Sequence, residues 1–202
     1  MKIVILPGVG YGEEPKDFKL KEKLKKKFSC NVEWFNWKHN LQIPNTTLPL
    51  KSYRNWICEV ILDFQMAVKH SFEIKVPEAD YYIGHSAGSI LALVQKKHCV
   101  IMGSPAILVE SVQNIPSMKC LLESPCIANI IHKYDLLSYP LPFENVENHY
   151  VSSNPFRFWN YFPPIAHSAY WSDDKIIDKV VNIIDHWEDD HMQKNSIQNS
   201  LT

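Results

Sequence analysis

Short apolar runs alternate along this chain with longer segments whose apolar residues recur at helical spacing. The candidate strands lie at 3–6, 31–37, 80–83, 99–102, 128–132 and 147–151, the first an unbroken aliphatic run and the second rich in aromatic residues. The helical stripes lie at 16–28, 53–69, 86–97 and 176–187. Strands that are apolar on both faces and alternate with helices are typical of a parallel sheet covered on both sides. The pattern therefore predicts an α/β fold of three layers, a mainly parallel sheet of about six strands with helices on both faces.

The length of 202 residues fits a single domain with a full hydrophobic core. We assign residues 1–188 to that domain. Residues 189–202 lack the apolar stripe that precedes them, and we expect them to form a flexible tail. The longest irregular stretches, 106–125 and 152–166, are too short for a large cap domain. We therefore expect an open site.

Composition argues against several classes of function. Lys plus Arg total 21 against 22 Asp plus Glu, which gives no bulk attraction to nucleic acid or to an anionic membrane. No apolar run approaches the roughly 20 residues that a membrane-spanning helix needs, and the apolar N-terminus is too short for a signal peptide. The five cysteines lack zinc-type spacing. We expect a cytoplasmic protein without metal or cofactor, and the oligomeric state stays open.

The segment Gly84-His85-Ser86-Ala87-Gly88 stands between a predicted strand and a predicted helix. A serine at the tip of such a tight turn takes a strained backbone conformation, and the flanking glycines remove side chains that would clash. The amides at the start of the following helix point at the same spot and favour a developing negative charge. The pattern therefore indicates that Ser86 is a nucleophile.

On this motif the sequence resembles the α/β-hydrolase superfamily, specifically its small single-domain serine esterases and lipases. The members of that family carry serine, acid and histidine in this order along the chain. The resemblance implies a catalytic triad of Ser86, Asp135 and His167. In such a triad the histidine takes the serine proton, and the acid orients the imidazole and stabilises its protonated form.

Position along the chain supports both assignments. Asp135 comes just after the predicted strand 128–132, at the sheet edge where a parallel sheet carries its functional loops. His167 precedes the closing helix, in a segment that we expect to be a loop. The alternative residues are His149 for the histidine, and Asp173 and Asp174 for the acid.

The resemblance also implies an oxyanion hole formed by the backbone amides of Ala87 and Val9. Val9 lies in a glycine loop after the first strand. If the strand order is 2-1-3-4-5-6, this loop meets Ser86 where the winding of the sheet reverses. The candidate residues for the substrate pocket are Tyr11, His85, Trp159, Tyr161 and Phe162.

The function implied by the resemblance is hydrolysis of a carboxylic ester with a short or medium acyl group, through an acyl-enzyme intermediate. The expected partner is a small-molecule acyl substrate. A thioesterase or amidase with the same triad and a non-catalytic binding module on the same scaffold are the alternatives. Dinucleotide binding is disfavoured because Glu13 stands where the phosphate-binding fingerprint requires glycine.

Overall fold

The computed structural model describes residues 1–8, 13–37, 65–107, 124–152 and 163–200. Six parallel strands form one sheet in the order β2-β1-β3-β4-β5-β6. The strands are β1 (Lys2–Leu6), β2 (Asn31–Trp34), β3 (Tyr81–His85), β4 (His98–Met102), β5 (Ile127–His132) and β6 (Val146–Val151). The predicted α/β class is therefore confirmed, and the sheet has the strand order that was assumed for the meeting of the glycine loop with Ser86.

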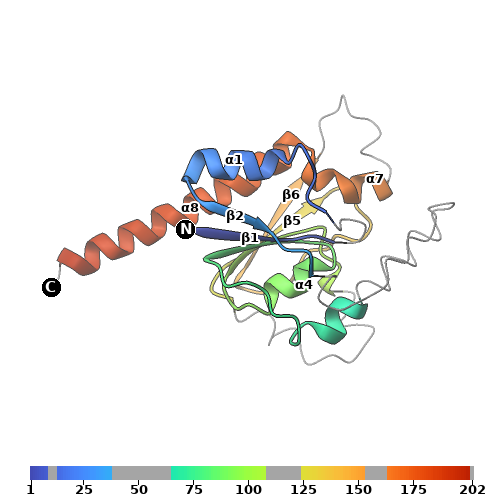
Figure 1. The fold of residues 1–202 in the computed structure, drawn as a ribbon, viewed down its shortest axis with the longest axis horizontal. Coiled ribbons are helices and arrows are strands. Elements are labelled where there is room, and N and C mark those ends of the chain that lie inside the picture. The colour runs from blue at the N-terminus through green and yellow to red at the C-terminus, as the bar shows by residue number, and fades with distance from the viewer. Residues whose placement is uncertain (9–12, 38–64, 108–123, 153–162, 201–202) are drawn as a thin grey trace.

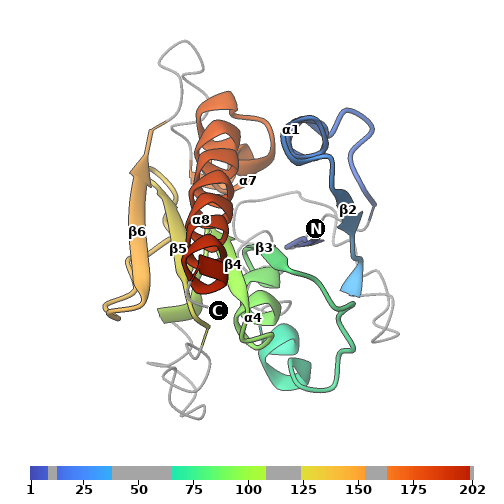
Figure 2. The same ribbon diagram turned by 90° about the vertical axis from the view of Figure 1, so that its left-hand side faces the viewer.

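Helices lie on both sides of this sheet. Figure 1 shows α1 (Lys19–Phe28) and α8 (Asp174–Ser200) on one side and α4 (Gly88–Leu93) on the other. Figure 2, turned by 90°, shows the same separation and places α8 across the middle strands. The short helix α7 (Pro163–Ser168) and the 3-10 helix η2 (Ala169–Trp171) lead into α8.

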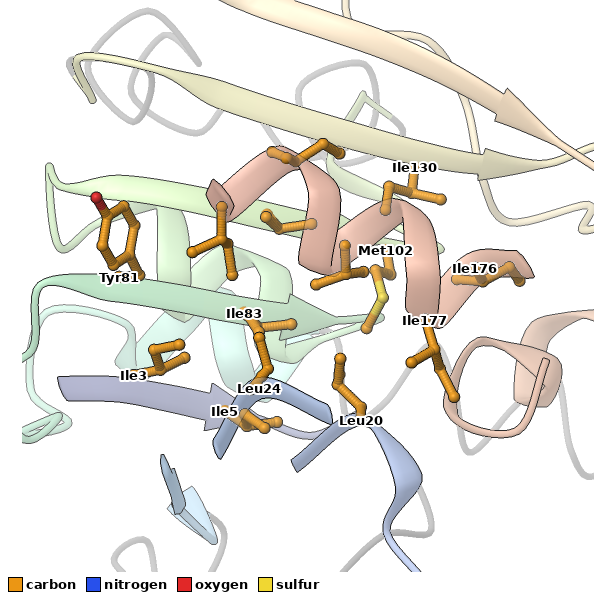
Figure 3. Packing of buried hydrophobic residues seen from close by; sticks show 14 of the residues in the cluster. Ile3, Ile5, Leu20, Leu24, Tyr81, Ile83, Met102, Ile130, Ile176 and Ile177 are labelled. Atoms are coloured by element: carbon orange, nitrogen blue, oxygen red, sulfur yellow. The ribbon is translucent and has the colours of Figure 1, made fainter. Parts of the chain in front are cut away.

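Two hydrophobic clusters follow from the alternation of side chains along each strand. On β1, Val4 and Leu6 face the cluster beneath α4, whereas Ile3 and Ile5 face the cluster beneath α1 and α8. Figure 3 shows the second cluster, in which side chains from the sheet interleave with side chains from α1 and α8. Its labelled members are Ile3, Ile5, Leu20, Leu24, Tyr81, Ile83, Met102, Ile130, Ile176 and Ile177.

The lysine-rich helix α1 pairs with α8 through side chains spaced at helical intervals. Exposed ion pairs each contribute only about 0.2–1 kcal/mol, whereas full burial of a leucine side chain contributes about 1.5–3 kcal/mol. Leu20 and Leu24 are fully buried, so apolar packing holds α1 in place and the charges set its register. The pairs are Lys19–Asp174 at 3.2 Å, Lys23–Asp178 at 2.6 Å and Lys27–Asp185 at 2.8 Å.

Three predicted elements are shorter in the structure, and the first of them, the helix at 16–28, begins only at Lys19. The predicted helix 86–97 is reduced to α4 because Ser86 and Lys96, with φ of 52° and 54°, adopt left-handed conformations that a helix excludes. The predicted strand 31–37 ends at Trp34. Just after it, the buried Trp37 donates from its indole Nε1 to the carbonyl of Pro7, at 2.7 Å. Of the predicted helix 53–69, residues 65–69 are described and helical, and the rest lies outside the described residues.

The closing helix is longer than its apolar stripe predicted. α8 continues to Ser200 and extends past the amino-terminal edge of the sheet (Figure 1). Neither glycine nor proline follows Pro164 in the sequence, so no residue of that kind stops the helix. The predicted flexible tail at 189–202 is therefore helical as far as Ser200, and its flexibility stays a prediction. Among the described helices, none has the length and apolar character needed to cross a membrane.

Candidate functional site

Ser86 occupies a sharp turn between β3 and α4. Its φ of 52° lies in the left-handed region, a conformation that costs a residue with a side chain about 1–2 kcal/mol. The Ser86 amide donates to the Met102 carbonyl at 2.9 Å and ties the turn to the end of β4. The Ser86 Oγ atom is buried and makes no hydrogen bond to any residue that the structure describes. The turn therefore carries backbone strain at a serine whose hydroxyl forms no hydrogen bond within the described part of the chain.

Two glycines let the chain pass close to this turn. A Cβ atom on Gly8 would lie 2.5 Å from the Cβ atom of Ser86, and one on Gly88 would overlap the Leu6 carbonyl. The loop after β1 and the turn after β3 therefore touch, as the strand order predicted. The amide of Ala87, a predicted oxyanion donor, stands at the N-cap of α4. Val9, the other predicted donor, lies outside the described residues.

Asp135 and His167 form a buried pair. Asp135 follows β5 by three residues, and its Oδ2 atom lies 2.9 Å from His167 Nδ1. The side chains are 0% and 5% exposed respectively, so water does not screen the interaction. An ionised carboxylate only accepts hydrogen bonds, so Nδ1 carries the proton and a neutral ring has its lone pair on Nε2.

His167 lies in helix α7, not in the loop that the sequence predicted. Pro163 and Pro164 are its first two residues, and proline is well suited to the first turn of a helix because its φ is already helical and it has no amide to satisfy. The helix gives His167 a fixed backbone, which the predicted loop would not have provided.

Three donors hold the Asp135 carboxylate. Besides His167, the Tyr170 hydroxyl donates to Oδ2 at 3.0 Å and the Leu137 amide donates to Oδ1 at 3.0 Å. Burial raises the pKa of the Asp135 carboxyl, but the hydrogen bonds and charge of His167, with the bonds from Leu137 and Tyr170, bring the pKa below its ordinary value. The carboxylate is therefore ionised and able to stabilise a protonated imidazole.

Gly103 joins the Asp135–His167 pair to the Ser86 turn. It follows Met102, whose carbonyl accepts from Ser86, and its φ is 56°. A Cβ atom on Gly103 would lie 3.0 Å from Asp135 Oδ2 and 3.2 Å from His167 Cε1. The structure thus gathers an alcohol, an imidazole and a buried carboxylate at the carboxyl-terminal edge of the sheet.

His85 supports this arrangement from inside the fold. Its Nε2 atom lies 2.8 Å from the His167 carbonyl, and its ring centroid is 4.9 Å from that of His167 and 5.1 Å from that of Trp171. Burial, followed by the nearby charge of His167, lowers the pKa of His85 to about 3. The ring is therefore neutral and donates to α7. Its predicted place in the substrate pocket stays a prediction.

His85 should make the protein sensitive to mild acid. Its pKa is about 3 in the folded state against 6.5 ordinarily, so between these values the unfolded chain binds a proton that the folded chain does not. Stability then falls as pH decreases, by about 1.4 kcal/mol per pH unit. His85→Gln keeps an Nε2 donor for the His167 carbonyl but does not titrate. Urea unfolding should show that this variant loses about 2 kcal/mol less than the native protein between pH 6.5 and pH 5.

Equal losses in the two proteins would contradict this account of His85. His132 and His149, whose pKa values burial also lowers, are unchanged in the variant and contribute equally to both curves. The difference between the curves therefore isolates His85.

The alternative site residues have other partners. His149 lies in β6 with its Nε2 atom 3.3 Å from Glu147 Oε2. Asp173 accepts from the Lys175 amide at 3.0 Å and caps α8, and Asp174 pairs with Lys19. Four pocket candidates, Tyr11, Trp159, Tyr161 and Phe162, lie outside the described residues.

Sequence reasoning missed Tyr170 and Gly103. Tyr170 lies three residues after His167, the spacing at which helical neighbours share a face, but the predicted loop concealed this relation. Gly103 directly follows the apolar run 99–102, and a glycine at the carboxyl end of a parallel strand was an available signal.

Within the described ranges, no group of three His, Cys, Asp or Glu side chains is arranged to bind a metal ion. Neither a protein-family model nor a curated protein matches this sequence.

Proposed function

We propose that this chain is a serine hydrolase of the α/β-hydrolase superfamily that cleaves carboxylic esters with short or medium acyl groups. The observation that carries the proposal is the left-handed turn at Ser86 beside the 2.9 Å contact between His167 and Asp135. A structural turn needs neither a serine in a strained conformation nor a buried carboxylate–imidazole pair next to it.

In the proposed acylation step, Ser86 Oγ attacks the ester carbonyl carbon while His167 Nε2 takes the hydroxyl proton. Catalytic hydrogen bonds are often long before substrate binds, so Oγ and Nε2 close their separation in the substrate complex. Asp135 stabilises the imidazolium by accepting from Nδ1. The imidazolium then gives its proton to the departing alcohol, and the acyl group remains on Ser86.

Water completes the proposed cycle by the same proton path. The water oxygen attacks the acyl carbon while His167 Nε2 takes a proton from that water molecule. His167 then gives this proton to Ser86 Oγ as the carboxylic acid leaves. The amides of Ala87 and Val9 are the proposed donors to the oxyanion of each tetrahedral intermediate. The left-handed turn at Ser86 supports this role for Ala87, because Ala87 follows the nucleophile directly and begins α4.

A fluorophosphonate probe tests this proposal. Such probes phosphonylate serines activated by a neighbouring base. We expect the native protein to be labelled and Ser86→Ala to remain unlabelled, with mass spectrometry placing the adduct on Ser86. Ser89→Ala is the matched control, because Ser89 is a buried serine three residues further on. Well-folded native protein that takes no label would instead favour the non-catalytic binding module.

The substrate class is tested with p-nitrophenyl esters of increasing chain length. Turnover that is highest on the shorter soluble esters would support the proposed class. Activity restricted to emulsified long-chain lipid would contradict it. Matched thioester and amide substrates decide among the acyl-transfer chemistries that the same machinery serves.

A further inference from the structure

Tyr170 is a buried phenol whose hydroxyl takes part in two hydrogen bonds at the candidate site. Its side chain is fully buried in the second hydrophobic cluster. The hydroxyl donates to Asp135 Oδ2 at 3.0 Å and accepts from the His132 backbone amide at 2.9 Å. Because Asp135 Oδ2 also accepts from His167, one carboxylate oxygen serves the phenol and the imidazole together.

The direction of these hydrogen bonds is fixed by chemistry. Burial and the charge of Asp135 raise the pKa of the Tyr170 hydroxyl well above 10, so the phenol keeps its proton and donates it to the carboxylate. The His132 amide only donates, and it polarises the phenol oxygen and strengthens the donation onward. The end of β5 is thereby linked through Tyr170 to Asp135.

A carboxylate oxygen with two donors offers each of them less negative charge than it would offer one alone. The donation from Tyr170 therefore weakens the hold of Asp135 on the protonated form of the His167 ring. It also fixes the carboxylate plane, since Leu137 holds only the other oxygen. Both effects reach His167 through Asp135, because the phenol meets the carboxylate itself.

We infer that Tyr170 is a positioning residue for the proposed hydrolase reaction, one that holds Asp135 and limits how strongly Asp135 stabilises protonated His167. This inference rests on the proposed function for its kinetic consequence. Tyr170 acts on the proposed proton transfer through Asp135, and it is not itself a catalytic residue.

The test combines the pH profile of ester hydrolysis with the NMR signal of the His167 Nδ1 proton. In Tyr170→Phe the carboxylate loses one donor, so the protonated imidazole is better stabilised. The acid limb of the kcat/KM profile should move up by about 0.5 pH unit, which lowers kcat/KM about threefold relative to the plateau at pH values below that limb. KM should stay unchanged, and the Nδ1 proton should move downfield as its hydrogen bond strengthens.

A second variant protects the test against a folding defect, because Tyr170→Phe leaves the buried His132 amide without its acceptor. Site-specific Tyr170→3-fluorotyrosine keeps the hydroxyl and makes it a stronger donor. The acid limb and the Nδ1 resonance should then move in the opposite direction. Opposite shifts in the two variants cannot come from a general loss of stability.

Tyr81→Phe is the matched control. Tyr81 is another largely buried phenol that donates to a carboxylate, Glu188 Oε1 at 2.5 Å, but it lies at the amino end of β3, away from the candidate site. The Tyr81→Phe variant should be less stable than the native protein, but neither the acid limb of its kcat/KM profile nor the His167 Nδ1 signal should shift. Failure of both Tyr170 variants to move the Nδ1 resonance, or an equal effect of Tyr81→Phe, would overturn the inference. If the native protein hydrolyses no ester, the proposed function fails, and the resonance alone then decides the role of Tyr170.

Discussion

Ser86→Ala should lower kcat for p-nitrophenyl ester hydrolysis by about 10⁴- to 10⁶-fold and leave the thermal midpoint unchanged or slightly higher. The loss follows from removal of the hydroxyl that the proposed reaction uses as its nucleophile. Stability is retained because the buried Oγ makes no hydrogen bond to the described residues, so alanine removes a desolvated polar atom at no cost in contacts. Stopped assays of the Ser86→Ala variant measure kcat, and thermal denaturation of the same preparation measures the thermal midpoint.

The combination of variants sharpens this expectation. Groups that act as one unit are not additive, so Ser86→Ala combined with His167→Ala should be no slower than the slower single variant. Ser89→Ala provides the opposite pattern, since Ser89 Oγ contacts the Ser86 carbonyl at 2.5 Å and Ser104 Oγ at 2.7 Å. It should lose about 1–2 kcal/mol of stability and keep fluorophosphonate labelling. Additive losses for Ser86 and His167 would show that the two side chains do not act together.

The sheet could be predicted because its pattern is local. The four inner strands, β1, β3, β4 and β5, are short and mostly apolar, and parallel strands buried on both faces need no alternation to be recognised. The strand order was assumed as a condition in the sequence analysis, and the structure shows that order. The boundaries were less predictable where backbone geometry decided them. The left-handed conformations of Ser86 and Lys96 confine α4 to Gly88–Leu93, and nothing in the apolar pattern of the sequence signals them.

The candidate site was predictable where a residue lies at a strand end. Ser86 and Asp135 follow β3 and β5, and both positions can be found from the strands alone. His167 was found by its order in the chain, but its helix was not, because the six-residue α7 is too short to show an apolar period. The position of Tyr170 beside Asp135 could be inferred only from that helix, so the role of Tyr170 was missed as well. The extension of α8 to Ser200 was missed because a polar helix carries no stripe.

Gly103→Ala should damage the site and the fold together. A Cβ atom at this position meets Tyr170 Cε2 at 2.9 Å, Asp135 Oδ2 at 3.0 Å and His167 Cε1 at 3.2 Å. The φ of 56° costs about 1 kcal/mol for alanine, and the displaced neighbours add about 2 kcal/mol. The thermal midpoint should therefore fall by about 10 °C. Moving the imidazole by a fraction of an ångström should also lower kcat about 100-fold, with a smaller effect on KM.

The cost of the left-handed backbone and the cost of the crowded neighbours can be separated with Lys96. This residue has a φ of 54° and already carries a side chain. The stability difference between Lys96→Ala and Lys96→Gly measures the cost of a Cβ atom in the left-handed conformation, without the contacts of Gly103. If Gly103→Ala loses no more than that difference, the predicted crowding does not exist. If Gly103→Ala loses more stability than that difference but keeps full kcat, the neighbouring side chains move aside without displacing His167. Only a loss in both quantities agrees with a glycine that keeps Asp135, His167 and Tyr170 in register with the turn at Ser86.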